Sequence, residues 1–189
     1  MTIASALAAR RIWLAGLALL ATACDTSGFR DAYMALDSAG QRKREKFFTD
    51  TENVYCVGKL ASGVDDLTVS AVLRAEQLYD PHSGDPIEVD YYLGVKDQAP
   101  GKGKDITVSF LLERNQADDP YPAGKFSCEL QLDGEVKERL PFEIAFPDCP
   151  EAPIVTGAAC AGFVLEGSRC PGALADACLC GADGVWQCH

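Results

Sequence analysis

Six of the nine cysteines lie between residue 149 and the end of the chain at residue 189. They are Cys149, Cys160, Cys170, Cys178, Cys180 and Cys188. A segment this short cannot bury an adequate apolar core, so covalent links must replace one. We therefore expect residues 148–189 to form a disulfide-rich module with internal bridges only. Pro147, Pro150 and Pro153 mark its boundary with the preceding chain.

The end of this module reads as a hairpin. Cys178 and Cys180 are two residues apart, so in an extended chain they share a face and need different partners. Residues 181–184 would form the turn, and Trp186 lies on the returning limb. Trp186 is either the apolar filler of the module or an exposed contact residue. The remaining connectivity is left open by the sequence.

Two groups of residues have side chains that could bind a metal, but simpler interpretations fit both. Cys178, Cys180, Cys188 and His189 have zinc-ligand chemistry, but the usual Cys-x2-Cys spacing is missing. Residues 80–85 could supply oxygens to calcium, but they lack the acidic ladder of a calcium loop and read as a turn. We expect no metal and no cofactor.

The first 23 residues have the pattern of an export signal. Arg10 and Arg11 precede an apolar run over residues 12–23, which is too short to span a bilayer core of roughly 20 residues. Residues 20–24 read Leu-Ala-Thr-Ala-Cys, which resembles the lipobox of bacterial lipoproteins. The resemblance implies cleavage before Cys24, lipidation of Cys24, and attachment to a membrane of the cell envelope.

Charge and cysteine parity agree with export. The chain has a net charge of −11, and loss of the two signal arginines makes it −13, which argues against a nucleic-acid partner. With Cys24 set aside for lipid, Cys56, Cys128 and the six later cysteines form an even set, as expected for disulfides.

Residues 24–52 are interpreted as the lipid anchor and tether. Phe29, Tyr33 and Leu36 have the spacing of a short helix. Farther along, Arg42, Lys43, Arg44 and Lys46 form a basic cluster. The cluster either contacts anionic lipid headgroups or is the solvated face of a linker.

Residues 53–147 read as all-β. Apolar alternation and β-branched or aromatic content predict strands over 53–60, 67–74, 87–95, 105–112, 125–132 and 136–146, separated by turns rich in Gly, Pro and Asp. Asp133 and Gly134 predict a tight hairpin turn, because these residues tolerate a positive φ. Short strands at this spacing indicate a sandwich or a barrel.

Two family resemblances refine this prediction. Residues 124–128, Gly-Lys-Phe-Ser-Cys, resemble the Gly-x-Tyr-x-Cys segment on a late strand of immunoglobulin-like sandwiches. That resemblance implies an immunoglobulin-like β-sandwich with a disulfide between Cys56 and Cys128. The C-terminal cysteine spacing, with Gly157-x-x-Cys160 and Trp186-x-Cys188, is similar to a cysteine-rich module of uncharacterised bacterial envelope lipoproteins.

Catalysis is not expected. The chain has two histidines and none of the nucleophile, phosphate-loop or metalloprotease motifs. We expect a membrane-anchored binding or structural surface module, with an envelope or extracellular protein as its possible partner. One alternative is a protease inhibitor that presents residues 164–169, with Arg169 as the recognised residue. Another is an accessory subunit of an envelope complex.

Overall fold

The computed structural model describes residues 28–60, 67–98, 106–114, 116, 119–150, 152–175 and 177–189. These residues form β-strands and loops and contain no α-helix, so the all-β prediction is confirmed. Within them, no helix has the length and hydropathy needed to span a membrane. The predicted export signal and Cys24 lie outside the described residues.

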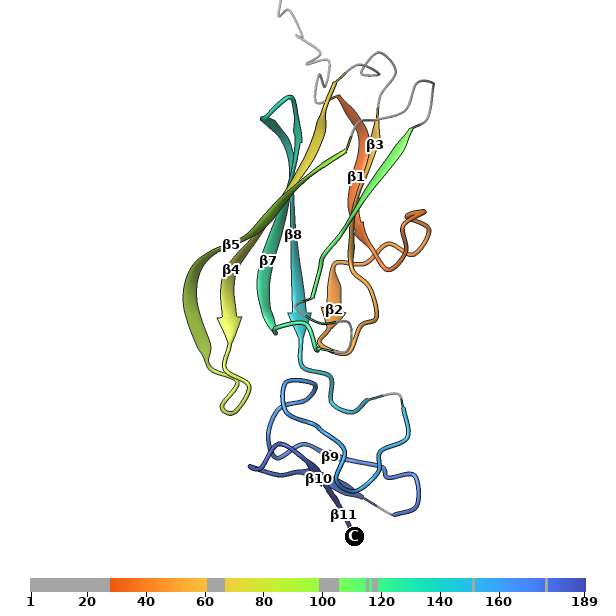
Figure 1. Ribbon diagram of the computed structural model, residues 1–189, viewed down its shortest axis with the longest axis vertical. Coiled ribbons are helices and arrows are strands. Elements are labelled where there is room, and N and C mark those ends of the chain that lie inside the picture. Colours follow the sequence, from red (N-terminus) through yellow and green to blue (C-terminus); the bar gives the residue numbers. More distant parts are fainter. Residues whose placement is uncertain are drawn as a thin grey trace, which may run out of the picture.

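Eight strands form the body of the molecule, and three short strands follow in the C-terminal module (Figure 1). The body contains β1 (Phe29–Ala35), β2 (Lys46–Phe48), β3 (Tyr55–Leu60), β4 (Val69–Tyr79), β5 (Pro86–Gln98), β6 (Thr107–Leu111), β7 (Gly124–Leu132) and β8 (Glu135–Ala145). The module contains β9 (Arg169–Cys170), β10 (Cys178–Cys180) and β11 (Trp186–Cys188).

The body consists of two sheets, which we call the two-sheet body. One sheet has the order β1-β3-β6 and the other β2-β8-β7-β4-β5. All described pairs in them are antiparallel except β2 with β8, which is parallel. Side chains from both sheets share one apolar core. The predicted Cys56–Cys128 bridge is present and joins β3 to β7 across this core, with the two Cα atoms 6.5 Å apart.

Strand β7 shows why the alternation was informative. Phe126, Cys128, Leu130 and Leu132 are all buried in the shared core, at every second position along the strand. The strand then turns through Asp133 and Gly134 with φ values of 48° and 82°. The predicted Asp-Gly hairpin is therefore confirmed, and β8 returns along β7.

The prediction of a short helix in the tether region is wrong. Phe29–Ala35 is the edge strand β1, hydrogen bonded to β3, and Phe29 and Met34 are buried in the core. A few apolar residues cannot distinguish a helix from a strand by spacing alone, and a partner strand far along the chain decided the outcome. Strand β2 also lies inside residues 24–52, so most of the segment interpreted as anchor and tether belongs to the two-sheet body.

The C-terminal module has three internal disulfides and no bridge to the body, as predicted. The pairs are Cys149–Cys170, Cys160–Cys180 and Cys178–Cys188. Cys178 and Cys180 therefore have different partners, and residues 181–184 connect β10 to β11 as a hairpin. The disulfides surround a small core that contains Ile154, Val164 and Trp186.

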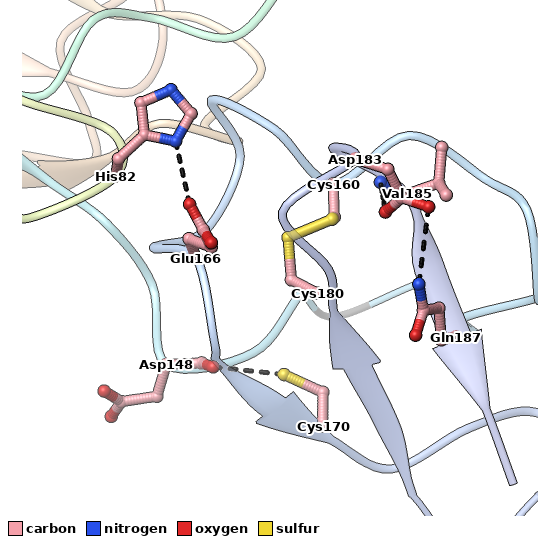
Figure 2. The surroundings of a disulfide bond; sticks show 9 residues. All are labelled: His82, Asp148, Cys160, Glu166, Cys170, Cys180, Asp183, Val185 and Gln187. Atoms are coloured by element: carbon pink, nitrogen blue, oxygen red, sulfur yellow. Dashed lines mark hydrogen bonds and ion pairs between the residues drawn. A yellow bond between two sulfur atoms is a disulfide. The ribbon is translucent and has the colours of Figure 1, made fainter.

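The module lies against one end of the two-sheet body (Figure 1). The Thr49 hydroxyl donates a hydrogen bond to the Phe163 carbonyl. On the β4–β5 hairpin, Nδ1 of His82 lies 2.8 Å from a carboxylate oxygen of Glu166, as Figure 2 shows. These contacts come from two different loops of the body, so the module is held at more than one point.

Candidate functional site

An open cleft of about 1040 Å³ lies where the two-sheet body meets the C-terminal module. One wall comes from the β1–β2 loop, from strand β2 and from the residues that follow it up to Asn53. The other wall comes from residues 147–150 and 152–154 together with Ala158, Ala159, Phe163 and Trp186. The cleft is the strongest candidate for a functional site in the described part of the chain.

Strand β2 sets the character of the first wall. Phe47 is 1% exposed in the core, and its neighbours Lys46 and Phe48 point outward because side chains alternate along a strand. Phe48 is 43% exposed, which is unusual for so large an apolar side chain. Strand β2 therefore presents a cation and an aromatic ring to the cleft.

The outer backbone edge of β2 is closed beside Phe48. The Phe48 N–H donates to Oγ1 of Thr51 over 2.9 Å, and the Thr51 N–H donates to the Phe48 carbonyl over 3.0 Å. These bonds occupy the groups with which an added strand would pair. Side chains are thus the main recognition elements of this wall.

Within the β1–β2 loop, some cations of the basic cluster form ion pairs and others do not. Asp37 accepts hydrogen bonds from the backbone N–H groups of Gln41 and Arg42, at 3.0 and 2.8 Å. These bonds, the Gln41 one foremost, hold the pKa of Asp37 below its ordinary value of 3.8. The Asp37 carboxylate also lies 3.4 Å from Nε of Arg42, so it neutralises one cation of the cluster.

A second cation of the cluster is also paired. Lys43 Nζ lies 2.7 Å from Asp31 and 3.7 Å from the centre of the Tyr33 ring. Arg44 and Lys46 differ, since both are exposed and neither has an ion-pair partner among the residues that the structure describes. All four cations are evident in the sequence, but which two form ion pairs depends on the folded loop.

The module wall is rich in proline and includes Trp186. The indole is 4% exposed and packs in the module core, which supports the filler interpretation over the exposed contact residue. The large apolar side chains that the module does expose are Val155 and Leu174, at 53% and 100%. Neither residue was predicted to be an exposed contact, although Leu174 follows the Pro171-Gly172 pair, a turn signal that places side chains at a surface.

The loop suggested for protease inhibition is packed against the body. Val164 is 1% exposed, and the N–H groups of Glu166, Gly167 and Ser168 donate to the carbonyls of Pro81, Cys180 and Leu165. Arg169 is exposed, but it lies on β9 and pairs with Leu179 of β10.

The residues weighed as metal ligands are otherwise engaged. Cys178, Cys180 and Cys188 are in disulfides, and the described residues contain no group of three or more His, Cys, Asp or Glu side chains that could hold a metal. Asp80 instead closes the β4–β5 turn, since its carboxylate accepts the N–H groups of His82 and Ser83 at 2.7 and 3.0 Å.

The chemistry of the cleft suits recognition. Its lining contains three cations and three carboxylates among apolar side chains, with no histidine, and its cysteine, Cys149, is in a disulfide. No protein-family model matches the chain, and no curated protein matches it either.

Proposed function

We propose that this protein is a membrane-anchored envelope lipoprotein that acts as a binding and structural surface module and not as an enzyme. The observation that carries the proposal is the pairing of cysteines. The eight cysteines after Cys24 pair completely with one another, which leaves none of them as a partner for Cys24. That pairing supports both an oxidising compartment and the assignment of Cys24 to lipid.

We further propose an immunoglobulin-like relationship for the two-sheet body. The order β8-β7-β4-β5 in one sheet and β3-β6 in the other matches the separation of strands between the sheets of such sandwiches. The Cys56–Cys128 disulfide links the sheets as in antibody domains. Such sandwiches are common scaffolds for binding, although the fold alone assigns no partner.

The position of β1 supports an outward-facing role for the cleft. Strand β1 begins at Phe29, only a few residues after Cys24, at the end of the body opposite the C-terminal module (Figure 1). An anchor at Cys24 would hold that end beside the membrane. The cleft and the module would then face away from the lipid, toward an envelope or extracellular protein.

The same geometry bears on the basic cluster. Arg42, Lys43, Arg44 and Lys46 follow β1, whose seven residues span roughly 20 Å at about 3.3 Å each. Lys43 reaches back to Asp31 near the start of β1, but the Arg44 N–H bonds to the Met34 carbonyl near the end of β1, away from the proposed anchor. This position of Arg44, with Lys46 beyond it, favours a contact with a partner over one with lipid headgroups.

The protease-inhibitor alternative receives less support. An inhibitor that binds as a substrate presents an extended loop whose backbone is free to pair with the enzyme. Three consecutive N–H groups in residues 164–169 are already hydrogen bonded within the protein. The cleft, by contrast, is open to solvent and has unpaired cations on its wall.

Expression of the full chain in a bacterial host tests the anchor. The wild type should appear in the membrane fraction, with a mature mass that begins at Cys24 and includes acyl chains. Cys24→Ser should stay unacylated and uncleaved, because serine lacks the thiol that would carry the lipid. Asp25→Asn, a change next to the same junction, should still be acylated. A wild-type chain without acyl mass, or a Cys24→Ser chain that is cleaved and fractionates normally, would refute the proposal.

A further inference from the structure

Arg44 and Lys46, the two cations of the basic cluster without an ion pair among the described residues, line the cleft together with the exposed ring of Phe48. Lys46 and Phe48 point to the same side of β2, because side chains alternate along a strand. Arg44 precedes this strand and is separated from Lys46 by a bend at Glu45. The cleft lining thus places positive charge next to an exposed aromatic ring.

The proline-rich part of the cleft lining adds further apolar surface. Pro147, Pro150, Pro153 and Ile154 line the cleft there and offer aliphatic surface. A pocket with mostly apolar walls and a few fixed charges is typical of a recognition site, since the apolar surface supplies affinity and the charges set orientation.

The carboxylates of the cleft limit what can occupy it. Asp50, Glu52 and Asp148 line the cleft together with the cations. A polyanion with evenly spaced charge, such as an acidic polysaccharide, would place some of its charges against these carboxylates. A ligand with only a few negative charges, paired with Arg44 and Lys46, meets less of that repulsion.

We propose that this cleft binds an extended peptide segment of a partner protein, with acidic residues at one end and apolar residues next to them. The carboxylates of the peptide pair with Arg44 and Lys46, and its apolar side chains pack on Phe48 and the prolines. This inference rests on the binding role proposed above and names the chemistry of the partner.

A peptide array tests the site. The full chain, purified in detergent, is applied to an array of short random peptides and to a parallel panel of acidic oligosaccharides. The bound peptides should be enriched in Asp, Glu and apolar residues, and binding should weaken as salt is added. Arg44→Glu with Lys46→Glu should weaken binding of the selected peptides about tenfold or more, and Phe48→Ala should weaken it by a comparable factor.

The matched control carries the same change of charge elsewhere. Lys125→Glu with Arg169→Glu alters two exposed cations that are outside the cleft lining and have no ion-pair partner in the described part of the chain. This variant should bind the selected peptides like the wild type, and all variants should show the same disulfides and similar melting temperatures. Equal losses in both double variants, a bound set rich in Lys and Arg, or binding to the oligosaccharides alone would overturn the proposal. Because the array is read in detergent, its result does not depend on whether Cys24 is acylated.

Discussion

Thr49 joins the C-terminal module to the two-sheet body through hydrogen bonds of its side chain and its backbone. Its side chain is fully buried, and its hydroxyl donates to the Phe163 carbonyl of the C-terminal module. Its own N–H donates to the Ala145 carbonyl of β8, and its carbonyl accepts the N–H of Tyr121. A single residue after β2 thus links the module to two segments of the two-sheet body.

Thr49→Val should lower the free energy of unfolding by about 1–2 kcal/mol, because valine keeps the shape and leaves the Phe163 carbonyl without its donor. Urea unfolding measures the change. Thr107→Val, at an exposed position on β6, should change stability by no more than about 0.5 kcal/mol. Equal effects of the two substitutions would show that the hydroxyl bond contributes nothing.

Asp80 should make the β4–β5 turn sensitive to acid. The N–H groups of Ser83 and His82 hold its pKa below the ordinary value of 3.8. A lowered pKa in the folded state means that the carboxylate stabilises the turn at any pH above 3.8 and that this contribution is lost as the pH falls through the folded pKa. NMR should show the Ser83 amide signal moving only below pH 3.8.

Two substitutions separate this effect from general acid unfolding. Asp80→Asn should remove the acid transition of the Ser83 amide, and Asp85→Asn, in the same turn, should leave it in place. A transition that persists in Asp80→Asn would assign it to another group.

At the level of elements, β3 to β8 were predictable and β1 and β2 were not. Each strand from β3 to β8 carries its own alternation and is flanked by Gly, Pro or Asp turns, so local patterns were sufficient. Strand β1 carries an ambiguous spacing, and β2 is three residues long inside a basic cluster. Their pairing with β3 and β8 comes from distant parts of the chain, which no local pattern contains.

The cleft was beyond local prediction for a related reason. Its walls combine the β1–β2 loop, β2, the proline-rich boundary and the far end of the module. The sequence shows that Arg44 and Lys46 are basic. It does not show that Arg42 forms an ion pair with Asp37 and Lys43 with Asp31, because these pairs depend on how the loop folds back on β1. The module pairing was likewise open, because six cysteines allow fifteen connectivities.

The disulfide between the sheets should stabilise more than the shortest one in the module. Cys56 and Cys128 are 72 residues apart, and closing that loop is worth about 4 kcal/mol in the chain-entropy model. Cys178 and Cys188 are 10 residues apart, for about 3 kcal/mol. Replacing each pair by alanine and measuring denaturant unfolding should give losses in that order. A Cys178/Cys188 variant with the larger loss would contradict the loop-length argument.

For the whole molecule, reduction should unfold the C-terminal module before the two-sheet body. The body has a large shared core, whereas the module depends on its three disulfides. After removal of the first 23 residues, Trp186 is the one tryptophan left, so its fluorescence reports on the module. A titration with reductant should change this fluorescence at a lower concentration than the β-sheet circular dichroism, and a chelator should change neither. Simultaneous loss of both signals, or an effect of the chelator, would contradict this picture.

The opposed positions of β1 and the C-terminal module have a mechanical consequence. With an anchor at Cys24, only three residues separate the lipid from Gly28, and from there the chain enters a stiff pair of sheets. The length of the sheets would then fix the distance between the cleft and the bilayer. A partner held at that height would meet the cleft at a high local concentration, and one confined to the headgroup layer would pass beneath it. A longer spacer before Gly28 would let the cleft occupy a wider range of distances from the bilayer. Partners at different distances could then bind, although no contact in the cleft would change.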